Sequence, residues 1–144
     1  KKFMKEVSKF LKPDGVIFFG FPAWRMPYGG HQQVAVGKLA SKLPYYHILP
    51  MPVYKGMLKV MGEKKDKIEG LVEVKETRIS TARFERLAKE NDFKIEKKQK
   101  YFVAPIYKYK FGMNPKKLTP IVGGIPWLND FFTFQSYYVI SQNN

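Results

Sequence analysis

The residue best suited to acid–base chemistry is His31, one of two histidines in the chain. Imidazole exchanges a proton near neutral pH, so a histidine can act as a general base or acid. His31 follows two glycines in a loop, and that loop comes directly after an apolar run at 16–21 that predicts a strand. Because α/β enzymes place their chemistry beyond the carboxyl ends of strands, we predict that His31 is catalytic. The alternative is that its side chain caps a helix that begins near Gln32.

The loop around His31 also carries side chains that suit a substrate pocket. Trp24 and Tyr28 offer flat apolar rings, Arg25 offers a cation, and Gln32 offers an amide that both donates and accepts hydrogen bonds. We predict that these four residues bind substrate. Packing of the loop onto a sheet would explain the two aromatic residues equally well, and Gln32 would also suit an exposed helix surface.

The second histidine, His47, predicts a structural role rather than a chemical one. It lies in the aromatic segment Tyr45-Tyr46-His47, which is bracketed by prolines and suits a packed, irregular stretch. The chain has no cysteine, which excludes disulfides and thiolate metal sites. With two histidines and no metal-ligand spacing, the sequence predicts no metal centre.

The charge of the chain points to a polyanion as a possible partner. The formal net charge is +14 over 144 residues, and such a balance favours nucleic acid or an anionic membrane surface. A basic aromatic stretch at 101–111, followed by Lys116-Lys117, suits contact with phosphates and stacking on bases. A solvated strand with its tyrosines turned inward explains the same stretch. A non-catalytic module that binds RNA or another polyanion is therefore the alternative function.

The sequence predicts a cytoplasmic protein. The first residues lack the continuous apolar core of a signal peptide, and no window approaches the 18 or more apolar residues of a membrane span. Hydrophobic residues make up 44% of the chain, which is typical of a globular domain.

The elements that would position these residues begin with a helix and a strand. Apolar residues at helical spacing predict a helix over 2–11 that ends before Pro13. Asp14-Gly15 then predicts a tight turn. The strand at 16–21 shows no polar alternation, so we expect it to be covered on both faces, as in a parallel α/β sheet.

The middle of the chain predicts mostly helix. We expect a short helix from His31 to about Leu43 and another over 52–61, with a charged turn at 63–67. The segment that ends at Thr77 fits either helix or strand.

The last third returns to a helix and two strands. Ser80 predicts the N-cap of a helix, and Asn91-Asp92 can end it in left-handed geometry. A long strand follows at 93–103, and a last strand is expected at about 131–140. Two strands joined without a long helix predict antiparallel neighbours at a sheet edge. The expected buried positions of the long strand are Phe93, Ile95, Tyr101 and Val103.

Three segments share their patterns with one known family. The first is the helix that ends in Leu11-Lys12-Pro13-Asp14-Gly15 and enters the apolar strand. The second is the helix–strand pair from Ser80 to Ile95, and the third is the phrase Pro27-Tyr28-Gly29-Gly30-His31-Gln32-Gln33. These residues resemble class I S-adenosylmethionine-dependent methyltransferases, and the third phrase is similar to bacterial methyltransferase-domain proteins. The resemblance covers nearly the whole chain but only the C-terminal half of that family's domain.

The resemblance implies an α/β fold, the C-terminal half of a Rossmann-like methyltransferase sheet. The run at 16–21 would be the fifth strand, the strand at 93–103 the sixth, and 131–140 the seventh, inserted antiparallel beside the fifth. Residues 22–78 would then be a helical insertion that forms a substrate lid, and the implied activity is methylation of an acceptor of unknown identity.

The cofactor implied by the resemblance is S-adenosylmethionine, but its main site would not lie in this chain. The family holds the cofactor over a glycine-rich loop and an acidic residue in the first half of the sheet. No G-x-G-x-G occurs here. We therefore expect a fragment whose cofactor half lies N-terminal to Lys1 and which is inactive alone. A further alternative is a half that assembles with a separate partner chain.

Overall fold

The structure is a computed structural model that describes residues 2–125 and 127–143, without the side chains of residues 2 and 33. It is mixed α/β and divides into two compact units. Unit 1 comes from both ends of the chain, up to Ala23 and from Ser80 onward, and unit 2 is Trp24–Ile79. Unit 2 spans nearly the same residues as the helical insertion expected at 22–78.

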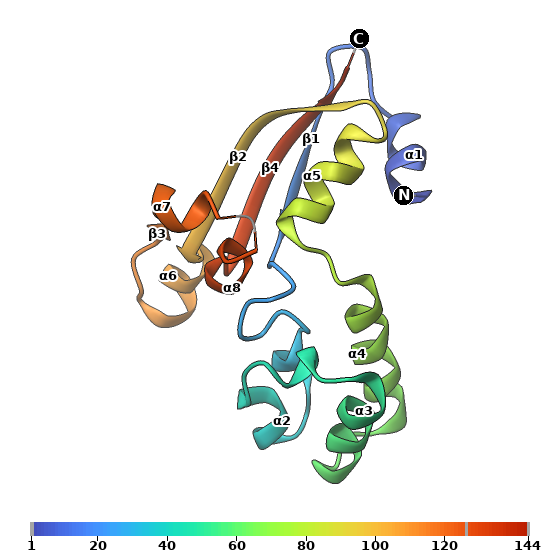
Figure 1. Ribbon diagram of the computed structural model, residues 1–144, viewed down its shortest axis with the longest axis vertical. Helices are drawn as coiled ribbons and strands as arrows, with labels where there is room; N and C mark the ends of the chain where they lie inside the picture. Colours follow the sequence, from blue (N-terminus) through green and yellow to red (C-terminus); the bar gives the residue numbers. More distant parts are fainter. Residues whose placement is uncertain (1, 126, 144) are drawn as a thin grey trace. The chain divides into compact units, whose positions relative to one another are not determined.

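Unit 1 is built on an open sheet that has four strands within the described residues (Figure 1). The strands are β1 (Val16–Phe21), β2 (Phe93–Val103), β3 (Lys116–Lys117) and β4 (Gln135–Gln142). Their order is β1-β4-β2-β3, and every pairing is antiparallel. Because β1 and β2 both run opposite to β4, they run in the same direction on either side of it.

The strand predictions are confirmed in their pairing and corrected in two details. β4 pairs antiparallel with β2, as expected, and also with β1. It is an interior strand, however, and β3 takes the edge beside β2. The last strand begins at Gln135 rather than near 131, because α8 (Asn129–Phe132) occupies the preceding residues.

The expectation that β1 is covered on both faces is wrong. Its alternate residues Val16 and Phe18 are 60% and 63% exposed. The side chains of Phe19 and Phe21 point to the other face, where they meet the ring of Phe84 at centroid distances of 5.1 and 5.0 Å. Within the described residues, β1 has a strand neighbour on one edge and helices packed on one face only. An apolar run in the sequence therefore does not show how many faces of a strand are buried.

The helix against this face is α5 (Thr81–Lys89), and its sequence signals are confirmed. The Ser80 side chain accepts a hydrogen bond from Arg83 N at 3.0 Å, which satisfies a free amide of the first turn. Phe84 also lies 4.6 Å from the ring of Tyr138 on β4. Beyond the helix, Asp92 has the left-handed φ of 58° that the sequence predicted.

The N-terminal helix α1 (Lys2–Ser8) is shorter than the predicted 2–11. Its Phe3 contacts Phe19 edge-on at 6.2 Å, and its Met4 is buried, so the helix packs on β1. Two short helices, α6 (Ile106–Phe111) and α7 (Pro120–Gly123), complete unit 1.

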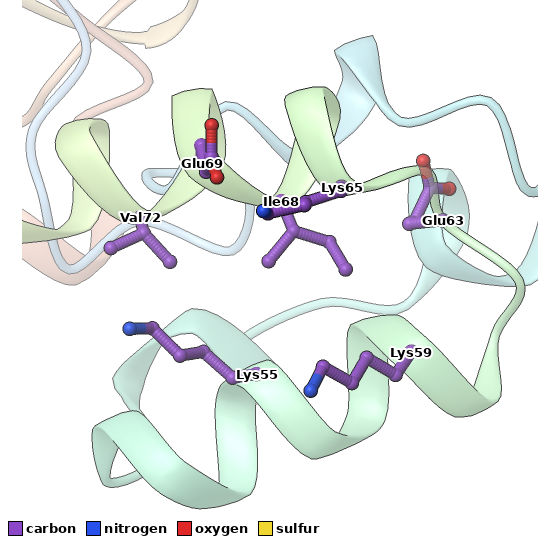
Figure 2. Close-up of a pocket in the computed structure, with 7 residues that line it drawn as sticks. All are labelled: Lys55, Lys59, Glu63, Lys65, Ile68, Glu69 and Val72. Atoms are coloured by element: carbon purple, nitrogen blue, oxygen red, sulfur yellow. The ribbon is translucent and has the colours of Figure 1, made fainter.

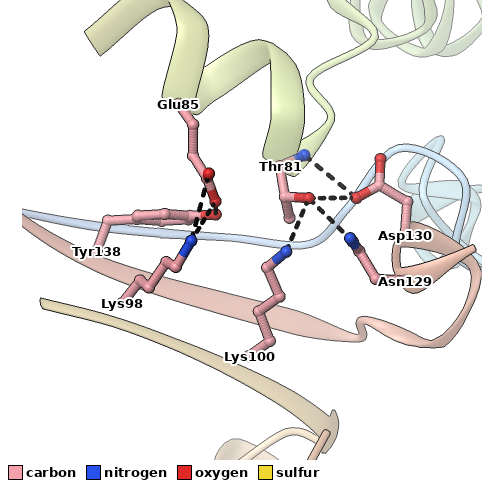
Figure 3. Close-up of polar contacts among 7 residues, drawn as sticks. All are labelled: Thr81, Glu85, Lys98, Lys100, Asn129, Asp130 and Tyr138. Atoms are coloured by element: carbon pink, nitrogen blue, oxygen red, sulfur yellow. Dashed lines mark hydrogen bonds and ion pairs between the residues drawn. The ribbon is translucent and has the colours of Figure 1, made fainter. Parts of the chain in front are cut away.

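A polar network ties α5 to α8 and to β2 inside unit 1 (Figure 3). The Asp130 carboxylate accepts hydrogen bonds from Thr81 Oγ1 at 2.6 Å and from Thr81 N at 3.2 Å. Lys100 Nζ donates to the same hydroxyl at 3.2 Å. A second pair lies nearby, where Tyr138 OH donates to Glu85 Oε1 at 2.9 Å. Burial of the Tyr138 phenol, with the Glu85 carboxylate beside it, raises the Tyr138 pKa.

Unit 2 is helical within its described residues. Its elements are η1 (Gln32–Val34), α2 (Lys38–Lys42), η2 (Tyr46–Ile48), α3 (Met51–Val60) and α4 (Lys65–Thr77). The segment that ends at Thr77, which fitted helix or strand, is helix. The single helix expected at 31–43 is two short ones, separated by a turn at 35–37. The core of the unit consists of Ala35, Ala40, Tyr46, Tyr54, Leu58, Ile68 and Leu71.

The turn between η1 and α2 is held by Glu63, which follows α3. Its buried carboxylate accepts hydrogen bonds from Val36 N at 3.2 Å and from Gly37 N at 2.6 Å. A side chain on Gly37 would place its Cβ 2.9 Å from Glu63 Oε1, so this approach of backbone and carboxylate requires glycine.

Candidate functional site

His31 lies at a surface pocket of unit 2 with a volume of about 460 Å³. The wall opposite η1 comes from α4, and the lining residues are His31, Val34, Asp66, Lys67, Gly70, Leu71 and Val74. His31 is exposed, with a left-handed backbone of φ 55° and ψ 27°. It occupies the N-cap position of η1, but its side chain makes no capping hydrogen bond. The capping role considered from the sequence is therefore not what this side chain does.

The groups around the pocket can support acid–base chemistry on a small polar group. His31 supplies an imidazole, Asp66 a carboxylate and Lys67 an ammonium, beside the apolar side chains of Val34 and Leu71. In the part of the chain that the structure describes, the His31 ring has no hydrogen-bond partner. Its nitrogens are thus available to a molecule that enters from solvent.

Next to His31 in the sequence, Gln32 enters a buried network instead of facing the pocket. Its Nε2 lies 2.7 Å from His47 Nδ1, and His47 Nε2 lies 2.8 Å from Trp24 O. A carbonyl can only accept, so His47 carries its proton on Nε2 and its Nδ1 accepts from Gln32. The prediction that His47 is a satisfied structural histidine is confirmed, since both ring nitrogens are bonded and the residue is fully buried.

Burial sets the protonation state of His47. Loss of water around the ring lowers its pKa to about 4, and the ammonium of Lys75 adds to this effect. The hydrogen bond to the Trp24 carbonyl opposes the shift but does not outweigh it. His47 is therefore neutral near pH 7 and holds the loop that carries His31.

A buried lysine completes this network. Lys75 Nζ donates to the backbone carbonyls of His47 and Leu49, the latter at 2.6 Å. It also lies 5.0 Å from the ring centre of Tyr54 and 5.7 Å from that of Trp24. Burial, with a contribution from Arg78, lowers the Lys75 pKa. Carbonyl dipoles and two aromatic faces stabilise this cation.

The structure places the four predicted substrate-binding residues in different surroundings. Trp24 and Gln32 are buried together around His47. Tyr28 is half-buried, and its hydroxyl donates to Lys42 O at 3.3 Å, while Arg25 is exposed. The sequence missed Asp66 and Lys67, which were expected in a charged turn at 63–67 but lie in the first turn of α4.

Among the described residues, the two glycine pairs do not form the glycine-rich loop that would hold S-adenosylmethionine. The space beside Gly30 is filled by His47, since a Cβ on Gly30 would lie 2.5 Å from the Cβ of His47. A ligand therefore has no room to approach the Gly30 backbone from that side. The other glycine pair, Gly123-Gly124, ends the short helix α7 rather than linking a strand to a helix. Among the described residues, neither pair forms the loop that the family uses for its cofactor.

A second pocket of unit 2, of about 400 Å³, lies between α3 and α4 (Figure 2). Ile68 and Val72 point from α4 toward α3, and the side chains of Lys55 and Lys59 come from the facing helix. Lys65, Glu63 and Glu69 complete the lining. The Glu63 carboxylate is already bonded to two backbone amides, so the exposed rim is mainly positive. Lys55 and Lys59 are four residues apart on α3 and therefore lie on the same side of that helix.

Comparison with known protein families, with curated proteins and with solved structures finds no match to this chain. In the described part of the molecule, His, Asp and Glu side chains do not gather in a group of three or more that could hold a metal ion. None of the helices described combines the length and the apolar character needed to cross a bilayer.

Proposed function

We propose that this chain is the C-terminal part of an S-adenosylmethionine-dependent methyltransferase domain. The observation that carries the proposal is the sheet of unit 1, in which the last strand, β4, pairs antiparallel beside β1. The resemblance implied this arrangement for the seventh strand beside the fifth. The first segment that suggested the family forms α1, the turn at Pro13-Asp14-Gly15, and β1, and the segment from Ser80 to Ile95 forms α5 and the start of β2.

The free side of β1 supports the same proposal. Within the described residues, one edge of β1 has no strand neighbour, and Val16 and Phe18 on one face are largely exposed. An open edge with apolar side chains is a liability that proteins normally cover. Further strands of the same domain, added beside β1, would satisfy the free backbone groups of this edge.

In this proposal unit 2 is the substrate lid, and His31 is its acid–base residue. A hydroxyl or amine acceptor loses a proton when it is alkylated, and the exposed imidazole of His31 takes that proton. Lys67 and Asp66 orient polar groups of the acceptor, while Val34 and Leu71 contact its apolar part. Alignment of the acceptor is the main contribution of such a lid to the rate.

The test uses the complete reading frame that contains these residues. Its product should bind S-adenosylmethionine in calorimetry, whereas the 144-residue chain alone should not. The segment before Lys1 should contain a strand followed by a glycine-rich loop. A complete product that shows no binding at millimolar cofactor, or a reading frame that starts at these residues, would overturn the proposal.

A further inference from the structure

One part of unit 1 combines a strong positive charge with exposed apolar side chains. Between residues 97 and 129 the sequence contains no aspartate or glutamate. The same stretch contains seven lysines: Lys97, Lys98, Lys100, Lys108, Lys110, Lys116 and Lys117. All twelve acidic residues of the chain lie in the other segments, so this stretch concentrates the basic character of the chain.

Several large apolar side chains of this stretch face solvent. Tyr109 is 85% exposed, Ile121 83%, Phe111 67% and Trp127 62%. Tyr109 and Phe111 belong to α6, Ile121 belongs to α7, and Trp127 follows α7 in the sequence. The helices α6 and α7 lie with β3 near the end of β2 (Figure 1). Single exposed apolar residues need no explanation, but several in one acid-free region indicate an interaction site. We call these four residues, with Lys108, Lys110, Lys116 and Lys117, the basic aromatic surface.

We propose that the basic aromatic surface docks on a lipid bilayer that contains anionic headgroups. Tryptophan and tyrosine prefer the headgroup level of a membrane, where an apolar ring and a polar edge are both satisfied. Lysines beside them are attracted to anionic lipids, and no carboxylate in this stretch opposes that attraction. The protein lies on the membrane rather than across it.

The kind of apolar side chain favours a bilayer over a nucleic acid. A nucleic acid would pair with the lysines and stack on Tyr109 or Trp127. It offers no apolar surface for Ile121, however, which would stay in water at 83% exposure. Acyl chains accept aliphatic and aromatic side chains alike. A second copy of the chain fits less well, because each carries a net charge of +14.

The first experiment measures binding of the protein to vesicles at about 0.1 M salt. Vesicles of phosphatidylcholine alone are compared with vesicles that also contain phosphatidylserine, by cosedimentation. We expect binding to the anionic vesicles to be at least about tenfold tighter. The fluorescence of Trp127 should shift to the blue on binding, and Trp127→Phe should abolish this shift because Trp24 is already buried.

Two sets of variants distinguish the contribution of this surface to vesicle binding from the contribution of the net charge. Replacing its four lysines by glutamine (Lys108, Lys110, Lys116 and Lys117) should weaken binding to anionic vesicles by on the order of 100-fold. The matched control replaces four other exposed lysines: Lys5, Lys12, Lys38 and Lys89. The control variant should lose less than about tenfold. Ile121→Ser with Trp127→Ser should weaken binding by about tenfold without lowering the melting temperature, because both side chains are exposed.

Three outcomes would overturn the proposal. The first is undetectable binding to anionic vesicles at low salt. The second is an equal loss in the two lysine variants, which would mean that net charge alone acts. The third is tight binding of single-stranded RNA that the Ile121→Ser change leaves intact while vesicle binding is weak; that result would assign the surface to nucleic acid. None of these outcomes depends on whether the domain is a methyltransferase.

Discussion

Asp130 and Thr81 form a doubly bonded pair that closes the start of α5. The Asp130 carboxylate accepts both the hydroxyl and the backbone amide of Thr81, at 2.6 and 3.2 Å. A negative charge at a helix N-terminus is favourable, because free amides there carry partial positive charge. The pair also joins α5 to α8, although 49 positions separate the two residues.

Thr81→Val tests this pair. The change keeps the volume of the side chain but leaves Asp130 and Lys100 without their shared hydroxyl, so we expect a loss of about 2 kcal/mol in the free energy of unfolding. Chemical denaturation measures it. Thr119→Val is the matched control, since Thr119 is exposed and makes no capping bond, and it should change stability by less than about 0.5 kcal/mol. Equal effects of the two variants would contradict the role of the pair.

The buried His47 predicts a loss of stability on mild acidification. Its pKa is about 4 in the folded chain, against an ordinary value of 6.5. Between these two values the unfolded chain binds a proton that the folded chain does not, so stability falls as the pH drops from 6.5 toward 4. The full effect is on the order of 3 kcal/mol.

The measurement for His47 is a titration of the imidazole protons by NMR, together with denaturation at several pH values. The chain has two histidines, so the His31→Gln variant assigns the signals. A His47 signal that titrates near 6.5 in the folded protein would refute the prediction.

Gly30→Ala should destabilise unit 2. A Cβ at this position would lie 2.5 Å from the Cβ of His47, so backbone segments must move apart, at a cost of about 3 kcal/mol. Gly56→Ala is the matched control: it lies within α3 with no atom near the added methyl, and it should stabilise the helix by about 0.5–1 kcal/mol. Thermal denaturation of both variants gives the comparison. A Gly30→Ala protein as stable as the parent would show that the contact with His47 is not tight.

In the proposed methyltransferase, His31→Gln should reduce methyl transfer by the product of the complete reading frame. Loss of a general base typically lowers kcat by about 10²–10⁴-fold, and the pH dependence of kcat should lose its lower limb. Because His31 is exposed, the melting temperature should not fall. An unchanged kcat and pH profile would remove His31 from the reaction and leave it as a loop residue in left-handed geometry.

Local signals in the sequence predicted much of unit 1. The bounds of β1 and β2, the cap at Ser80 and the left-handed Asp92 each depend on a few neighbouring residues. A proline, a capping side chain or a turn residue acts on the backbone next to it. Such features can therefore be predicted without knowing the rest of the molecule.

The features that depend on distant segments were not predicted. The apolar run of β1 predicted a strand buried on both faces, but Phe18 is exposed. Burial of a strand depends on which distant segments pack against it, and the run itself does not contain that information. Nothing near Thr81 in the sequence indicated that Asp130 would bond to it. Lys75 stands among charged residues of a helix and resembles a solvated side chain, yet it is fully buried.

The candidate site was predicted in part for the same reason. His31 is exposed and lines a pocket, which its place after the glycines suggested. Gln32, its neighbour, turns inward to His47, and only the fold of the whole unit determines that direction. Asp66 and Lys67 reach the pocket because α4 packs beside η1, which no local pattern indicated.

Because the Lys75 ammonium is buried, its chemical reactivity reports how often unit 2 opens to solvent. Acylating reagents react with amines that meet solvent, and Lys75 is the one buried lysine among those whose side chains the structure describes. Its modification must wait for the unit to open, while the surface lysines react at once. The rate at which peptide mass analysis finds Lys75 acylated therefore gives the opening equilibrium of this unit alone, as protected amides do in hydrogen exchange.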